Sequence, residues 1–204
     1  MPRSNKTQYA LLGFLALRPM SGYDIKKWVE ASISNFWNEN YGQIYPALKS
    51  LTEAGLATKT SDETAGGRAR HVYALTEEGR AELERWLAEP TRPPSIRFEH
   101  LLKLFFGANA DVGVSIEQIE ARRVDCVSEL KRFRSIEYAI SESESDAAQR
   151  PFWLMTVRNG IRATEADIEW CDESLVELRA MAAQEAPELA GAAPGAGKAR
   201  AGRS

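Results

Sequence analysis

The first part of the chain contains three segments in which apolar residues recur at the spacing of an α-helix. This pattern predicts helices over residues 8–17, 22–32 and 42–54. The first segment ends before Pro19, which cannot continue a helix, and Ser21 has the position of an N-cap for the second. We expect the buried stripes of the second and third helices to consist of Tyr23, Ile25, Trp28 and Val29, and of Ile44, Leu48 and Leu51.

The hydrophobic pattern then changes to that of short strands. Residues 56–60 and 71–75 have the composition of β-strands, and the segment between them contains two adjacent glycines that suit the tip of a hairpin. Thr76 follows as a cap, with acidic residues in the first turn of a fourth helix that runs to Leu87. Three helices, a two-stranded hairpin and a fourth helix form the element order of a winged helix-turn-helix.

Beyond a break at Pro90–Pro94 the pattern is entirely helical, over residues 96–106, 115–143 and 151–184. The last helix has an apolar stripe whose spacings alternate between three and four, as in a coiled coil. Its members are Leu154, Val157, Ile161, Thr164, Ile168, Cys171, Leu175, Leu178 and Ala182. The stripe is a candidate for holding two copies of the chain together, or for packing within one chain against residues 116–140. We expect it to contribute to both contacts.

These elements predict a mainly α-helical protein with an N-terminal winged helix-turn-helix, which carries a two-stranded β-wing, and an all-helical C-terminal domain. Residues 1–89 are the predicted DNA-binding domain. Residues 95–185 are predicted to mediate dimerisation and to offer room for an effector. Residues 186–204, rich in Ala, Gly and Pro, predict a disordered tail.

Composition and charge narrow the class of protein only slightly. With 44% hydrophobic and 27% charged residues, the chain has the composition of a folded protein in water. The net charge is -3, but residues 1–76 contain nine Lys and Arg against six Asp and Glu, whereas the remainder contains 17 against 23. A positive N-terminal part is typical of a segment that meets an anionic polymer, although a difference of this size is common by chance.

Several classes of function lack the residues that they need. The sequence contains no Gly-rich phosphate loop, nucleophile elbow or metal-ligand cluster, so we expect neither an enzyme nor a cofactor. Cys126 and Cys171 have no ligand-type neighbours, which favours buried packing thiols over a zinc site or a redox role. No apolar run approaches the roughly 18–20 residues of a membrane span. We therefore expect a cytoplasmic protein without a membrane partner.

The predicted DNA interface centres on the third helix. In a helix-turn-helix this helix enters the major groove while the helix before it crosses the backbone. Its exposed side presents a Gln that can pair with adenine, a Tyr that can reach phosphate and a Lys that can meet guanine or phosphate. The preferred base contact is Gln43, and the full predicted set is Lys26, Tyr41, Gln43, Tyr45, Lys49, Lys59, Arg68 and Arg70. Winged-helix units also serve as protein-interaction adaptors without DNA binding, and that alternative stays open.

Four motifs, in the right order, resemble those of the PadR family of transcriptional regulators. They are Tyr9-Ala-Leu-Leu-Gly-Phe-Leu15, Ser21-Gly-Tyr-Asp-Ile25, Gly42-Gln-Ile-Tyr-Pro-Ala-Leu-Lys-Ser-Leu-Thr-Glu-Ala-Gly-Leu56 and Arg70-His-Val-Tyr-Ala-Leu-Thr-Glu-Glu-Gly79. The long helical C-terminal part resembles the larger subfamily, which includes phenolic-acid-responsive repressors and a virulence-gene activator. The resemblance implies a homodimer on a palindromic operator, with the C-terminal helices of one subunit gripping the other, and usually repression of a neighbouring gene.

The resemblance also bears on single residues. The family's Tyr-Pro in the recognition helix corresponds to Tyr45-Pro46, which implies a backbone contact for Tyr45. This chain departs from the family at Gln43, where Ser or Thr is common, and at Lys49, where Arg is common. The operator preferences of relatives should therefore not be transferred. Aromatic residues of the C-terminal part are candidates for lining a pocket for a small aromatic effector, although aromatics at helical spacing more often belong to a core.

Overall fold

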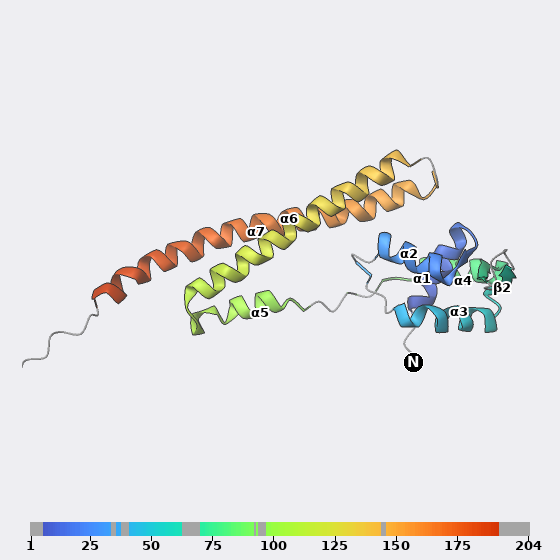
Figure 1. The fold of residues 1–204 in the computed structure, drawn as a ribbon, viewed down its shortest axis with the longest axis horizontal. Coiled ribbons are helices and arrows are strands. Elements are labelled where there is room, and N and C mark those ends of the chain that lie inside the picture. The colour runs from blue at the N-terminus through green and yellow to red at the C-terminus, as the bar shows by residue number, and fades with distance from the viewer. Residues whose placement is uncertain are drawn as a thin grey trace, which may run out of the picture. The chain divides into compact units, whose positions relative to one another are not determined.

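The computed structural model describes residues 6–33, 36–37, 41–62, 70–91, 93, 97–143 and 146–191. The chain divides into two compact units, Met1–Pro94 and Ser95–Ser204 (Figure 1). Each unit has its own apolar core.

The N-terminal unit has the element order of a winged helix-turn-helix. Its elements are α1 (Lys6–Leu17), β1 (Met20–Ser21), α2 (Gly22–Ala31), the 3₁₀ turn η1 (Tyr41–Gln43), α3 (Ile44–Glu53), β2 (Ala57–Asp62), β3 (Arg70–Leu75) and α4 (Glu77–Leu87). The predicted helices and hairpin strands are confirmed. The strand β1 was not predicted, because two residues are too few to show an alternation. It pairs Met20 with Tyr73, so that β3 lies between β1 and β2 in one antiparallel sheet.

Local signals fix the start of α2 and the end of α3. The Ser21 side chain accepts a hydrogen bond from the backbone N–H of Asp24, and the Asp24 carboxylate accepts one from the backbone N–H of Ser21. At the other end, Gly55 has a φ of 72°, and the Leu56 N–H donates to the Leu51 carbonyl at 2.9 Å. Both ends lie where the sequence predicts them.

The core of this unit confirms the predicted apolar faces with one exception. Ile25 and Val29 of α2 are almost fully buried, as is the predicted apolar side of α3. Tyr23, which the pattern assigns to the buried stripe of α2, is instead 57% exposed. The reason is geometric: two positions along a helix differ by about 200°, so burial of Ile25 turns Tyr23 outward.

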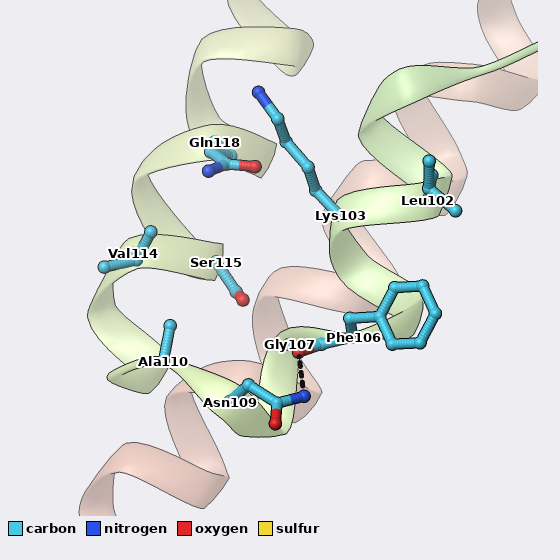
Figure 2. A pocket seen from close by; sticks show the side chains of 9 residues that line it. All are labelled: Leu102, Lys103, Phe106, Gly107, Asn109, Ala110, Val114, Ser115 and Gln118. Carbon is cyan, nitrogen blue, oxygen red and sulfur yellow. Dashed lines mark hydrogen bonds between the residues drawn. The ribbon is translucent and has the colours of Figure 1, made fainter.

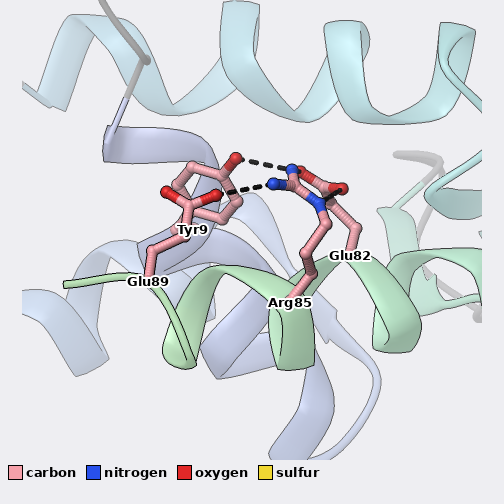
Figure 3. A network of polar contacts seen from close by, with 4 residues as sticks. All are labelled: Tyr9, Glu82, Arg85 and Glu89. Carbon is pink, nitrogen blue, oxygen red and sulfur yellow. Dashed lines mark hydrogen bonds and ion pairs between the residues drawn. The ribbon is translucent and has the colours of Figure 1, made fainter.

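Ring stacking and a polar network join α1 to α4, and Figure 3 shows the polar network. The rings of Tyr9 and Trp86 stack with their centroids 4.7 Å apart, and the Tyr9 hydroxyl donates to Glu82 Oε1 at 2.9 Å. Arg85 forms ion pairs with Glu82 at 2.5 Å and with Glu89 at 2.6 Å. The Arg85 guanidinium lowers the pKa of Glu82. These contacts hold α4 against the first helix of the unit.

The C-terminal unit is built on a long helical hairpin. Its elements are α5 (Glu99–Phe105), the 3₁₀ turn η2 (Gly107–Asn109), α6 (Val112–Glu142) and α7 (Arg150–Gly191). The antiparallel helices α6 and α7 lie side by side (Figure 1). Because α7 continues to Gly191, the start of the predicted tail, residues 186–191, is helical. Its Ala, Glu and Leu residues favour a helix despite one proline. Residues 192–204 lie outside the described part of the chain.

The seam between α6 and α7 uses the long apolar stripe of α7. Two core clusters line it, one around Ile119 and Leu175 and the other around Phe133 and Ile161. Gly160 permits a close approach, since a Cβ there would lie 2.8 Å from Phe133 Cζ. The stripe therefore packs within one chain, which was one of the two predicted uses.

Polar and sulfur-containing side chains complete the seam. Arg123 pairs with Asp172 across it at 2.5 Å. Cys126 and Cys171 are fully buried, and burial raises the pKa of both thiols. Because the reactive thiolate form is then scarce at neutral pH, the two side chains serve as the packing groups that the sequence predicts. Of the helices that the structure describes, none has the length and apolarity to cross a bilayer.

Candidate nucleic-acid interface

The exposed side of α3 brings together three of the predicted DNA contacts. Gln43, Tyr45 and Lys49 are all exposed, while Ile44 and Leu48 on the other side are buried. Gln43 is the N-cap residue of α3, and its side chain makes no capping hydrogen bond. Residues at the start of a recognition helix are the ones that reach base edges. The geometry therefore leaves the Gln43 amide available for a base.

Tyr45 is held in place by the first turn of α2. Its ring covers Gly22 so closely that a Cβ at Gly22 would lie 2.7 Å from Tyr45 Cε1. This contact gives Tyr45 a defined position although 58% of the residue is exposed. Burial, and to a lesser degree the neighbouring Tyr45, raises the pKa of the Tyr73 hydroxyl. Sequence reasoning missed the part played by Gly22. The available signal was a glycine directly after an N-cap, where it has no capping function.

The other predicted contacts are less closely defined. Lys49 Nζ lies 3.6 Å from Glu53, and Lys26 Nζ lies 3.7 Å from Glu30. Such exposed pairs along one helix contribute little, so a phosphate can compete for either lysine. Lys59 is exposed on the edge strand β2. Of the remaining predicted contacts, Arg68 and the side chains of Tyr41 and Arg70 lie outside the described part of the structure.

The C-terminal unit leaves a large apolar surface uncovered around α5. No residue of α5 is buried, and Phe105 is 81% exposed. A groove of about 380 Å³ lies beside it, with Leu102, Phe106 and Val114 among its lining residues (Figure 2). Separately, α7 exposes the apolar side chains of Phe152, Met155, Val176 and Met181. Because large apolar side chains gathered on one exposed helix often mark an interaction site, the α5 surface is a candidate for contact with a partner.

The residues predicted to mediate dimerisation lie mostly elsewhere. Four of the six are buried within the α6–α7 seam, namely Val157, Ile161, Leu175 and Leu178. Leu154 and Ile168 are half-buried and retain some surface. The periodicity identified the seam correctly but did not distinguish a contact within one chain from a contact between two.

The N-terminal unit is a DNA-binding winged helix-turn-helix. Residues 11–85 match the transcriptional regulator PadR-like family, and residues 96–179 match the virulence activator alpha C-terminal family. A probable transcriptional regulator of Mycobacterium tuberculosis, Rv1176c, is 33% identical over 178 residues, which cover 81% of this chain and 93% of that protein. The chain therefore belongs to the PadR-like family of transcriptional regulators.

Other relatives support the same fold. The negative transcriptional regulator PadR of Bacillus subtilis is 36% identical over 101 residues, 48% of this chain and 55% of that protein. Its crystal structure in complex with operator DNA has a TM-score of 0.76 at 23% identity, covering 85% of this chain and 99% of that chain. Its complex with p-coumaric acid has a TM-score of 0.73 at 21% identity, covering 88% and 98%.

A third solved structure, of a different protein, extends the comparison to an activator. The Vibrio cholerae virulence activator AphA is 29% identical, with a TM-score of 0.67, and the match covers 86% of this chain and 99% of that chain. The predicted fold class, a winged helix-turn-helix followed by an all-helical domain, is confirmed.

Proposed function

We propose that this chain binds duplex DNA sequence-specifically as a homodimer, on a palindromic operator, and represses a neighbouring gene. The observation that carries the proposal is the exposed side of α3, where Gln43, Tyr45 and Lys49 lie opposite a fully buried apolar side. A symmetric pair would present two such helices about one DNA turn, roughly 34–36 Å, apart. Repression agrees with the name of the Bacillus relative, a negative regulator.

Each side chain has a distinct role in this proposal. Gln43 pairs with adenine in the major groove, whereas Tyr45 and Lys49 contact phosphates and so fix the position of α3. Basic residues of the hairpin reach the backbone or a flanking minor groove, namely Lys59, Arg68 and Arg70. Tyr41 and Lys26 complete the proposed set of DNA contacts.

The homodimer contact is proposed for the apolar surface of the C-terminal unit. Its support is the exposed side of α5 together with the apolar residues that α7 leaves uncovered. Leu154 and Ile168 contribute the surface that they retain beside the seam. Residues 95–185 thereby act as the dimerisation domain, and residues 1–89 as the DNA-binding domain.

Release of the operator by a small aromatic effector is the remaining part of the proposal. The Bacillus relative has been solved with p-coumaric acid, and the C-terminal unit of this chain is rich in aromatic residues. Helical clefts lined by aromatic side chains are suited to such ligands. The α5 groove, at about 380 Å³, falls within the range of small-ligand pockets, and Phe106 is the one aromatic side chain among the described residues that line it.

Replacing Gln43 with Ala is expected to change which DNA sequences are bound. Replacing Lys49 with Gln is expected to weaken binding to duplex DNA of every sequence. A bidentate Gln–adenine contact gives about 1–3 kcal/mol of discrimination, so Gln43→Ala should lower the preference for the operator by roughly tenfold. Lys49→Gln should reduce affinity for operator and random duplexes alike. Fluorescence anisotropy with labelled duplexes that tile the region upstream of the chain's own gene measures both effects. Absence of binding to every duplex at low salt would favour the adaptor alternative.

Replacing Gly22 with Ala is expected to weaken DNA binding without weakening the fold. Ala is a better helix former than Gly, but its Cβ would displace the Tyr45 ring. The expected loss is about tenfold, the size of one hydrogen bond to a charged group. In a Tyr45→Ala background the same change should have no further effect. An equal loss in both backgrounds would show that Gly22 acts independently of Tyr45.

A further inference from the structure

A hollow of about 220 Å³ lies beside the first half of α2, outside the predicted set of DNA contacts. It is lined by Arg18, Pro19, Met20, Asp24, Lys27 and Trp28. Arg18 and Pro19 link α1 to β1, Met20 belongs to β1, and the other three residues belong to α2. The hollow therefore belongs wholly to the winged-helix unit.

The two cations beside the hollow, Arg18 and Lys27, lie over aromatic rings and form no ion pair with a carboxylate of the described residues. The Arg18 guanidinium carbon lies 4.9 Å from the centroid of the Trp28 ring, and Lys27 Nζ lies 4.7 Å from that of Tyr23. Within the described part of the chain, no carboxylate approaches Arg18 or Lys27 to ion-pair distance. Lys26, by contrast, pairs with Glu30 one helical turn away. A ring positions a cation but leaves its full positive charge, so this pair remains available to an anion.

The carboxylate that lines the hollow is committed to the helix cap. Asp24 Oδ2 accepts hydrogen bonds from the Ser21 backbone N–H at 3.2 Å and from Ser21 Oγ at 2.8 Å. Its charge therefore serves the capping box at the start of α2. The balance around the hollow is two cations against this single, already hydrogen-bonded carboxylate.

The hollow and the contact with α3 lie on different faces of the first half of α2, because Asp24, which lines the hollow, is turned by about 200° from Gly22. Gly22, in the first turn of α2, lies directly under Tyr45 in the first turn of α3. Helical side chains point back toward the N-terminus, and Lys27 does so by placing its ammonium over Tyr23. The Tyr23 ring, which the helix geometry turns outward, lies under Lys27 and not in the core.

We propose that this hollow holds a backbone phosphate of the bound DNA, with Lys27 and Arg18 as its donors and Tyr23 and Trp28 as supports. The inference rests on the proposed function. It adds to the contacts of α3 a backbone contact from α2 and the residues just before it. A phosphate contact carries no sequence information, so it fixes the orientation of the winged-helix unit and leaves base preference to Gln43.

The test is the salt dependence of DNA affinity. Each phosphate contact that is lost should lower the slope of log K against log[salt] by about 1. Lys27→Gln should lower this slope by about 1 for an operator duplex and for a random duplex of equal length, and the ratio of the two affinities should not change. The double variant Arg18→Gln/Lys27→Gln should lower the slope by nearly 2. Lys27→Arg should keep the slope of the unaltered chain. Lys131→Gln on α6, which removes one exposed lysine from the other unit, is the matched control.

The outcomes separate the two proposals. If the unaltered chain binds DNA but Lys27→Gln has the same slope and affinity as Lys131→Gln, the hollow is not a phosphate site and the proposed function stands. If the unaltered chain binds no duplex at all, the proposed function itself fails. Melting curves followed by circular dichroism check that each variant is folded. We expect little change in melting temperature, because Arg18 and Lys27 are both exposed.

Discussion

Replacing Gly79 with Ala is expected to destabilise the winged-helix unit by about 3 kcal/mol, at the upper end of the range for overpacked positions. A Cβ at Gly79 would lie 2.0 Å from the Leu56 carbonyl oxygen and 2.8 Å from a methyl carbon of Leu75. The carbonyl belongs to the backbone that joins α3 to β2, and it already accepts a hydrogen bond from the Thr76 N–H at 3.2 Å. The Leu75 methyl can shift with its side chain, but the carbonyl cannot move without loosening the backbone contact to Thr76, the N-cap residue of α4.

Thermal and urea unfolding, followed by circular dichroism, measure this effect. For a unit of this size, a loss of about 3 kcal/mol lowers the melting temperature by roughly 10–20 °C. Gly13→Ala in α1 is the matched control, since a Cβ there would meet nothing within 4 Å. It should leave stability unchanged or raise it slightly. Equal melting temperatures for the two variants would contradict the close packing of α4 on Leu56.

The parts of the fold that could be predicted are those set by local sequence. The capping box at Ser21, the left-handed Gly55 and the apolar spacing of α3 each act within one or two helical turns, so the sequence contains them in full. These local signals determine which side of α3 is exposed, and Gln43 and Lys49 lie on that side. The family resemblance added the expectation that this side contacts DNA, which periodicity alone does not provide.

The parts that could not be predicted depend on contacts between distant segments. The pairing of β1 with β3 requires Met20 to meet Tyr73, and no pattern within two residues indicates it. The close contact of Tyr45 with Gly22 likewise joins two helices. The stripe of α7 was recognised, but its partner was ambiguous because α6 of the same chain and a helix of a second chain offer the same kind of apolar surface.

This ambiguity decides how dimerisation should be tested. Leu175 lies in the stripe and is 4% exposed, so a charge at this position would be buried in the seam between α6 and α7. Such a variant would unfold the C-terminal unit whether or not the chain dimerises. An informative variant must instead alter apolar side chains that one chain leaves exposed.

The double variant Leu102→Glu/Phe105→Glu is expected to be a folded monomer with operator affinity reduced by about 100-fold or more. Both side chains are largely exposed on α5, and the change removes the ring contact of Phe105 with Phe106 (centroids 5.0 Å apart) but no buried side chain. Loss of the partner removes the simultaneous binding of two half-sites, which raises affinity by about 10²–10⁴-fold when the geometry permits it.

Light scattering gives the oligomeric state, circular dichroism the fold, and anisotropy the affinity at fixed salt. Leu87→Glu, an equally exposed leucine on α4, controls for added negative charge. A double variant that remains a dimer would place the contact elsewhere on the C-terminal unit. A monomer that keeps full operator affinity would show that one recognition helix suffices, and that the palindromic operator is not required.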